Sequence, residues 1–449
     1  NAIIDYGSLM YITLQRAKSA REAIKIMTTL VDKYGYYSTG ESFSIADPNE
    51  VWILEIIGKG PSDKGAVWVA RKIPDGYVSA HANQARIRTF PIAEKTNKSI
   101  KFSNINEIFN PDVETVYSDD VISFARKKGW YEGNDENFSF SDTYAPMTFG
   151  GARFCEVRVW SFFKDLHDNM GQYLDYVKGD DLDNRMPLWI KPNTKISPRD
   201  MMNFMRDHLE DTELDMRKDF GAGPFNKPYR WRPLTWEVDG ETYCNERATA
   251  TQQTGFSFVA QARDWLPNPI GGIFWFSVDD AASTVYTPLY AGLQKAPVTY
   301  AEDNGSMKEW SENSAFWTFN QVSNLAYTRY SLIHPYIHDL QQELEKRYTQ
   351  YTSMVDQKAQ ELYKDDKNKA VEFVSDFSVE NANGLVHQWK RFYRFLFMKF
   401  MDGNVKITEG REFKTNGTGV VELKQPGYSE EWYRKLIEET GNKFKVPES

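Results

Sequence analysis

The chain has little of what marks several classes of protein. Only two of its 449 residues are cysteine, Cys155 and Cys244, and only six are histidine. Two cysteines allow at most one bridge, which excludes a disulfide scaffold and leaves the redox compartment open. His334 and His338 have i,i+4 spacing but no acid beside them. We therefore expect neither a metal site nor a cofactor.

The sequence also has no excess of basic over acidic residues and no long apolar run. Lys plus Arg is 54 and Asp plus Glu is 63, giving a net charge of −9, which argues against a nucleic-acid partner. The longest apolar runs, residues 51–57 and 270–278, have strand length and not the roughly 18–20 residues of a membrane span. Phosphate-loop, dinucleotide-binding, zinc-protease and nucleophile-elbow motifs are all absent.

Aromatic residues are plentiful. They make up 15% of a chain whose 41% hydrophobic and 26% charged residues are ordinary for a globular protein. The aromatic side chains fit either a large core or a cleft that grips sugars or peptide side chains. Composition alone does not decide between the two.

The first part of the chain reads as two helices followed by a sheet. Apolar residues recur at helical spacing over residues 6–34, and Ser19 with Glu22 has capping-box form, so we expect a break near Lys18 and an end at Gly35. Glu55 stands inside the most apolar strand and needs a partner there, either as a structural pair or as a neighbour of a site. Four strands of an antiparallel meander are predicted, over residues 42–46, 51–57, 65–73 and 76–83.

The rest of the chain alternates between helix, strand and irregular segments. An acidic pair, Asp279 and Asp280, follows a predicted strand; it fits a turn, or a carboxylate pair for glycoside chemistry or calcium. The whole pattern predicts an α+β fold with an antiparallel sheet covered by helices. We expect helices at 113–129, 197–209, 312–349, 353–378 and 380–402, strands at 253–263 and 270–278, a strand or short helix at 153–163, an irregular segment at 212–245, and a short strand and helix after 405.

Several segments, in their order along the chain, resemble the secreted dipeptidase family of N-terminal-nucleophile (Ntn) hydrolases. The resemblance covers most of residues 1–300 and, more weakly, the helical C-terminus. It rests on DYGSL (5–9), LQRA (14–17), AREA (20–23), FSIAD (43–47), VWILE (51–55), AVWVA (66–70), PDGYVSAHANQ (74–84), YAPMTF (144–149), ARF (152–154), RVW (158–160), TQQTGF (251–256), WFSVDD (275–280) and YTPLY (286–290).

The resemblance implies a four-layer αββα sandwich. It places an Ntn-like core at residues 1–300, with its first strands missing, and a mostly helical part at 301–449 packed on it. It also implies amide hydrolysis by an N-terminal cysteine, whose own α-amine accepts the thiol proton. Residue 1 is Asn, which has no nucleophilic atom. We therefore expect the nucleophile to lie in a segment that is not in this chain, and the chain alone to be inactive.

Five residues are the candidates for the site. By resemblance, Asn83 holds the reacting carbonyl or the amine of the nucleophile, and Arg153 favours the thiolate, with Arg158 as its competitor. His81 and Gln84 flank Asn83 and are expected to line the pocket. Arg247 is a candidate clamp for a substrate carboxylate, on residue type alone.

The expected partner is a dipeptide or small amide, and a homo-oligomer is compatible with the sequence. Three alternatives stay open: an acylase for bile salts or penicillin-like amides, a carbohydrate-active enzyme using carboxylates such as Glu55 and Asp279–Asp280, and an inactive fragment. By resemblance the protein is periplasmic or secreted, although the chain shows no signal-peptide pattern.

Overall fold

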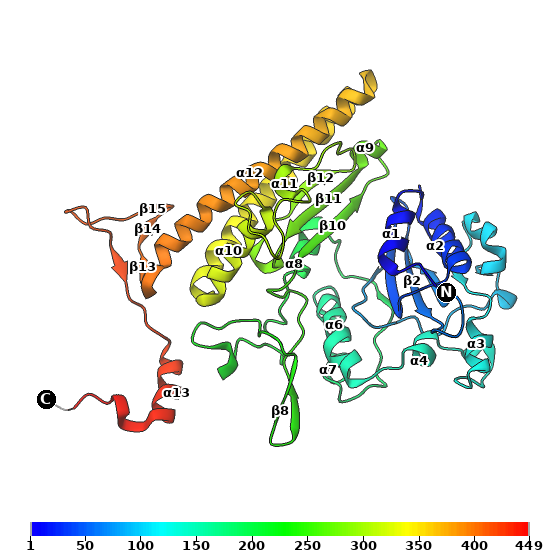
Figure 1. Cartoon of the computed structure of the whole chain (residues 1–449), viewed down its shortest axis with the longest axis horizontal. Helices are drawn as coiled ribbons and strands as arrows, with labels where there is room; N and C mark the ends of the chain where they lie inside the picture. The colour runs from blue at the N-terminus through cyan, green and yellow to red at the C-terminus, as the bar shows by residue number, and fades with distance from the viewer. Residues whose placement is uncertain (1, 448–449) are drawn as a thin grey trace. The chain divides into compact units, whose positions relative to one another are not determined.

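The computed structural model describes residues 2–447. The chain forms two compact units, the first ending at Lys195 and the second beginning at Ile196 (Figure 1). The first unit therefore holds only part of the core predicted over residues 1–300, and that functional division stays a prediction. No helix within residues 2–447 has the length and apolar character that crossing a membrane requires.

Two helices open the first unit where the spacing predicts them. They are α1 (Tyr6–Leu14) and α2 (Ala20–Tyr34), and Gly35 ends α2 with a φ of 75° that favours glycine. Ser19 Oγ accepts from the N–H of Glu22 at 3.2 Å, while the Glu22 carboxylate accepts from the N–H of Lys18. The predicted break near Lys18 is confirmed, with the acid reaching one residue beyond the usual capping box.

The main sheet of the first unit has the order β1-β2-β3-β6-β5. The predicted meander is right for its first three strands, which pair antiparallel, and wrong for the fourth. Pro74 and Gly76 turn the chain away, so β4 (Val78–Ser79) pairs instead with β7 (Trp189–Ile190). The other strands are β1 (Gly40–Ala46), β2 (Val51–Gly58), β3 (Ala66–Lys72), β5 (Ser99–Lys101) and β6 (Thr115–Tyr117).

The place beside β3 is taken by β6, inside the range predicted as helix 113–129. The helix there is only α3 (Val121–Lys127). The β-branched Thr115 and Val116 favour the strand, and both are buried. Parallel pairing of β5 with β6 completes the sheet.

Both faces of this sheet are buried. Trp52, Leu54 and Ile56 pack in one cluster with Ile24 and Met27 of α2. Ile53, Val67 and Val69 pack in a second cluster with residues of the segment after β4, including Ile87, Phe90 and Phe138. The near-continuous apolar run of β2 follows from this double burial.

A helical run later in the first unit changes geometry in its middle. It consists of α5 (Phe149–Gly151), a π-helical segment at Ala152–Glu156 and α6 (Val157–Lys164). The helical alternative predicted for residues 153–163 is therefore confirmed. The remaining helices of this unit are α4 (Phe140–Tyr144) and α7 (Leu174–Lys178), with short 3₁₀ turns at Ala93–Lys95, Phe102–Phe109, Asp135–Asn137 and Asp168–Tyr173.

The second unit packs a three-stranded antiparallel sheet against long helices. The strands are β10 (Phe256–Ala262), β11 (Gly272–Val278) and β12 (Thr287–Tyr290), in that order, and the first two confirm the predicted strands. The inward residues Val259, Ile273 and Trp275 share a cluster with the helices. These helices are α10 (Ala315–Thr328), α11 (Tyr330–Asp365) and α12 (Lys367–Phe400).

The predicted breaks between these helices are displaced. The chain continues as helix through residues 350–352 and 379, and breaks instead at Asp366, whose carboxylate caps α12 by accepting from the N–H of Asn368 at 2.9 Å. Helix α8 (Pro198–Phe204) begins where predicted, with a capping box between Ser197 and Asp200, and ends before Leu209. The segment predicted as irregular contains the hairpin of β8 (Thr235–Val238) and β9 (Glu241–Cys244), and α9 (Asn268–Gly271) precedes β11.

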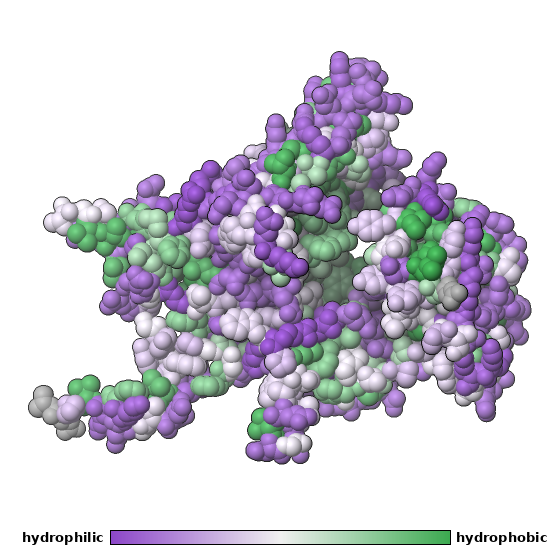
Figure 2. All heavy atoms as spheres, viewed as in Figure 1, coloured by the Kyte–Doolittle hydropathy of each residue, from purple (hydrophilic) through white to green (hydrophobic). Residues whose placement is uncertain are grey.

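The C-terminal part returns as short strands and a helix, as predicted. Two small antiparallel pairs join β13 (Val405–Lys406) to β16 (Leu423–Lys424) and β14 (Thr408–Glu409) to β15 (Glu412–Phe413). Helix α13 (Glu430–Thr440) follows and buries none of its residues. Hydrophobic residues appear on the surface among hydrophilic ones along this part of the chain (Figure 2).

The observed elements make an α+β protein with antiparallel sheets and packed helices. The four-layer αββα arrangement stays a prediction.

Candidate active site

Asn83 lies in the first unit, on the loop that follows β4. It is exposed and has a φ of 63°, in the left-handed region that Asn tolerates better than most residues. Its Oδ1 accepts a hydrogen bond from Nη2 of Arg158 at 2.8 Å. Because a guanidinium only donates, this contact orients the amide with Nδ2 available as a donor. The predicted placement at the end of a fourth meander strand is wrong, since the loop leaves the sheet before Asn83.

Arg158 holds both the loop and its own helix. Its Nη2 also donates to the carbonyl of Ala82 at 3.2 Å, and its Nε donates to the carbonyl of Phe154 at 3.1 Å. The side chain thus joins the first turn of α6 to the backbone beside Asn83. Of the two competing arginines, Arg158 is the one that the structure brings to Asn83.

Arg153 occupies the π-helical segment before α6. Its Nη1 donates to the carbonyl of Lys178 at 3.2 Å, at the end of α7. Single π-helical turns inside α-helices occur frequently at functional sites, because the wider turn redirects side chains. The structure places Arg153 and Arg158 on the same helical run, five residues apart.

A buried ion pair underlies the loop. The guanidinium of Arg86 meets the carboxylate of Glu156 at 3.0 Å, and both side chains are about 2% exposed or less. Arg86 also donates to the carbonyls of Ala80 and Leu188, and Tyr176 donates to Glu156. The pair therefore ties the loop of Asn83 to the π-helical segment that carries Arg153.

Glu55 anchors the same loop from the sheet. Its two carboxylate oxygens accept from the backbone N–H groups of Arg86 at 2.6 Å and Ile87 at 2.9 Å. Burial raises the pKa of Glu55 to about 7, and these donors oppose the rise. Glu55 therefore has polar partners, as expected of a buried carboxyl, and fixes the backbone next to the candidate site.

The two residues that flank Asn83 already have partners. His81 Nε2 lies 2.9 Å from Oγ of Ser44 on β1, and burial, aided by the charge of Arg86, lowers the pKa of His81 to about 4. His81 is therefore neutral at neutral pH. Gln84 Nε2 donates to the carbonyl of Ala145 at 2.7 Å. A Cβ on Gly151 would come within 2.8 Å of Gln84 Oε1, so a larger residue there would displace the Gln84 side chain.

Arg247 and the two cysteines are the other residues that the sequence singles out. Arg247 is half-buried in the second unit, after β9. Of the two cysteines, Cys155 is buried in the π-helical segment and Cys244 is half-buried on β9. Within residues 2–447 no three His, Cys, Asp or Glu side chains gather as metal ligands would.

The acidic pair after β11 forms a turn, as predicted. Asp279 and Asp280 are 1% and 0% exposed, and Asp280 Oδ1 accepts from the N–H of Ala282 to cap a short 3₁₀ turn. His334 donates from Nε2 to the carbonyl of Ala282 at 2.9 Å, which fits a packing histidine. Buried and used in this way, the pair is a poor fit to glycoside chemistry.

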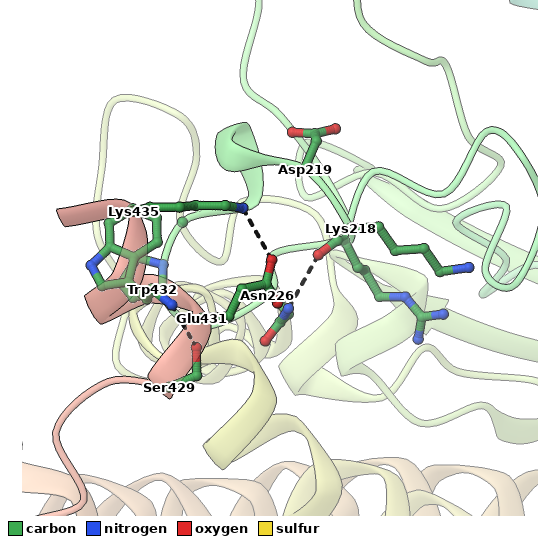
Figure 3. A pocket seen from close by; sticks show the side chains of 10 residues that line it. Lys218, Asp219, Asn226, Ser429, Glu431, Trp432 and Lys435 are labelled. Carbon is green, nitrogen blue, oxygen red and sulfur yellow. Dashed lines mark hydrogen bonds and ion pairs between the residues drawn. The ribbon is translucent and has the colours of Figure 1, made fainter. Parts of the chain in front are cut away.

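A pocket of about 340 Å³ in the second unit contains none of the predicted site residues. It lies between the segment 217–226 and α13 (Figure 3). Each of its cations is paired with an acid: Lys435 with Glu431 at 3.1 Å, and Arg217 and Lys218 with Asp215 at 2.7 and 3.5 Å. Such paired surface charges do not indicate an anion site.

Sequence reasoning missed Arg86, Glu156 and Ser44. Glu55 gave the available signal, since a glutamate inside an apolar strand requires polar partners nearby. The partners of Glu55 come from the loop 31 residues away, and Glu156, about 100 residues away, joins this network only through Arg86, so spacing alone does not identify them.

Comparison with known proteins shows which proteins this chain resembles. The chain is 26% identical over 285 residues to a probable dipeptidase of Salmonella dublin, covering 63% of this chain and 54% of that protein. It is 24% identical over 323 residues to a probable dipeptidase of Latilactobacillus sakei, covering 72% and 57%. Dipeptidase A of Lactobacillus helveticus is 23% identical over 325 residues, covering 71% and 56%.

The chain thus spans a little over half the length of these relatives. The model of peptidase family C69 matches residues 1–343, about three quarters of the chain. The chain therefore belongs to peptidase family C69.

Proposed function

We propose that this chain is the main body of a cysteine-type Ntn dipeptidase whose nucleophile lies in a segment outside this sequence. Family membership and the dipeptidase names of the relatives support peptide hydrolysis. The arrangement at Asn83 supports the location of the site. The chain alone then lacks the nucleophile and is inactive, and the whole protein is exported to the periplasm or secreted.

The observation that carries the proposal is the hydrogen bond between Arg158 and Asn83. Because the guanidinium holds Oδ1 at 2.8 Å, the amide Nδ2 is directed away as a donor. In the proposed reaction the cysteine thiolate attacks the peptide carbonyl, its own α-amine accepts the thiol proton, and Nδ2 of Asn83 stabilises the oxyanion. The nearby cations Arg153 and Arg158 favour the thiolate.

Buried, hydrogen-bonded side chains support this site. Arg86, Glu156 and Glu55 are buried and hydrogen-bonded, and they fix the loop on one side and the π-helical segment on the other. A site held by locked neighbours keeps its donors oriented before substrate arrives. The carbohydrate-active alternative has no such support, because Glu55 and the Asp279–Asp280 pair are buried and serve the backbone.

The test uses the full-length protein with its upstream segment. We expect Asn83→Ala to lower kcat on an unblocked dipeptide by about 10²–10³-fold, the usual loss of one oxyanion donor. Asn49→Ala changes an exposed Asn of the same unit and is the matched control. Normal turnover of Asn83→Ala would exclude this residue from the site.

A second arm separates the two arginines. Arg158→Lys keeps the charge but loses the planar donor, so we expect a lower kcat with little change in the pH at which the thiol reacts with iodoacetamide. Arg153→Ala removes a charge, and we expect that pH to rise. An unshifted profile would assign the electrostatic role to Arg158. Activity that survives complete alkylation would contradict a cysteine mechanism.

A further inference from the structure

The second unit contains a larger and more apolar pocket, which we call the Arg329 pocket. Its volume is about 470 Å³, within the range of small-molecule sites. It lies where α10 meets α11, against the C-terminal end of α12 and the segment 426–428. Most of its wall lies after residue 343, beyond the part of the chain that the family model matches.

The wall is apolar and partly uncovered. It includes Leu325 and Leu332 from the two helices, Phe397 and Phe400 from α12, and Tyr428 from the C-terminal segment. Phe397 is 53% exposed and Tyr428 is 46% exposed. Large side chains left open at the rim of a pocket offer apolar area to a ligand.

Arg329 is the half-buried cation of this wall. It sits between α10 and α11, its Nη1 donates to the carbonyl of Asn404 at 3.3 Å, and its guanidinium lies 5.5 Å from the ring centre of Phe400. Burial lowers the pKa of Arg329, and no acid opposes the shift. Within residues 2–447 no carboxylate comes within 4 Å of it.

Two more deeply buried arginines of the same unit differ in this respect. Arg206 is paired with Glu345 and Arg263 with Asp356, both as two-pronged contacts. A partly desolvated guanidinium without a carboxylate partner favours an anionic group supplied from outside. Arg329 therefore indicates that the pocket receives a carboxylate.

The pocket also holds an acid. Asp402 is exposed, lines the same wall and is not paired with Arg329. A lone negative charge disfavours a dianion such as phosphate and favours a ligand with its own cation. The wall thus offers one positive group, one negative group and apolar area between aromatic rings.

From this combination we propose that the Arg329 pocket binds an apolar amino-acid zwitterion. The carboxylate meets Arg329, the ammonium meets Asp402, and the side chain packs on the phenylalanine and leucine wall. For a peptidase this class includes the products of hydrolysis, so the pocket would be a second site for product on the same molecule. Binding is measured directly, so the proposal does not depend on the site at Asn83.

The test is calorimetric titration of this chain with L-phenylalanine and three truncated analogues. Phenethylamine lacks the carboxylate, 3-phenylpropionate lacks the ammonium, and glycine lacks the apolar group. We expect L-phenylalanine to bind, and each analogue to bind at least about tenfold more weakly. Equal binding of phenethylamine or of 3-phenylpropionate, or no binding of L-phenylalanine, would overturn the proposal.

Variants locate the binding. Arg329→Gln should weaken the binding of L-phenylalanine at least about tenfold and leave the binding of phenethylamine unchanged. Asp402→Asn should weaken the binding of L-phenylalanine but leave the binding of 3-phenylpropionate unchanged. Arg391→Gln, an exposed arginine of α12, is the control. If Arg329→Gln folds, by circular dichroism, and binds L-phenylalanine normally, the site lies elsewhere and the proposal fails. If the variant does not fold, the binding of the analogue series to the unaltered chain still tests the proposal.

Discussion

The two principal sheets of this molecule differ in how many of their faces are buried. The sheet of the first unit is buried on both faces, by α2 on one side and by the segment after β4 on the other. The sheet of the second unit buries one face against α10, α11 and α12 and leaves four phenylalanines on the other. Phe256 and Phe258 are 59% and 45% exposed.

The contrast shows that residue type does not fix which way a strand faces. In β10 the small polar Ser257 points inward, where its hydroxyl contacts Ser277 Oγ at 2.8 Å and Tyr286 Oη at 2.7 Å, while Phe258 points outward. Register with β11 places every second residue on the same face, so the buried Trp275 and Ser257 share one side. The hydrogen-bonded hydroxyls make the inward serine tolerable.

The largest effect expected from this comparison concerns the loop over the first sheet. Arg86→Met leaves Glu156 as an unpaired buried carboxylate, and we expect a loss of about 3–5 kcal/mol in the free energy of unfolding of the first unit. Urea unfolding followed by tryptophan fluorescence measures it. The double variant Arg86→Met/Glu156→Leu removes both charges and should recover much of the loss.

A matched control is the exposed pair of Arg434 and Glu430 on α13. Arg434→Met should change stability by no more than about 0.5 kcal/mol, because solvent screens such a pair. A small loss for Arg86→Met, similar to that of the control, would mean that the ion pair does not hold the covering segment.

Much of the first unit was predictable because its signals are local. The helix cap at Ser19 and the β-branched strands β1 to β3 are read from neighbouring residues, and these predictions are confirmed. The fourth meander strand was wrong because pairing partners lie far apart: β6 takes the place beside β3, about 45 residues along the chain.

The candidate site likewise contains some residues that the sequence predicts and others that it does not. Asn83 and the two arginines were reached through motif order, and the structure brings Arg158 to Asn83. The support from Arg86 and Glu156 joins residues 70 positions apart, which no short motif records. Long-range burial, not local propensity, decides these partners.

A smaller effect is expected on the pH dependence of stability, where a buried carboxyl in each unit can be compared. Asp279, at the end of β11, has a pKa raised to about 7 by burial. Between about pH 4 and 7 the folded chain keeps a proton that the unfolded chain releases, so this group makes stability fall as pH rises. Asp279→Asn should remove its share of the slope, at most about 1.4 kcal/mol per pH unit, and stabilise the second unit at pH 8.

The geometry favours this substitution. Asp279 has a φ of 70°, which Asn accepts, and its Oδ1 accepts from Asn320 at 2.8 Å. Its Oδ2 and the hydroxyl of Ser323 are both buried, and Ser323 is close enough to act on this carboxyl as a hydrogen-bond partner, a role that an amide also accommodates. Glu55→Gln is the contrast in the first unit: it also removes a carboxyl with a pKa of about 7 but costs an acceptor for a backbone N–H. If Asp279→Asn and Glu55→Gln raised the free energy of unfolding equally at pH 8, the loss of the backbone acceptor at Glu55 would have no cost, contrary to this expectation.

The smallest effect tests the open face of the second sheet. Phe258 packs against Phe274 in a tilted arrangement, with 4.6 Å between ring centres, but remains 45% exposed. Phe258→Thr keeps a residue that favours strands, so we expect a loss of about 1 kcal/mol, the value of an aromatic pair with little added burial. Leu54→Ala, on a fully buried face of the first sheet, should cost about 2–5 kcal/mol in the same urea titration. A loss at Phe258 as large as that at Leu54 would mean that this face is covered in solution, and the two sheets would then be buried alike.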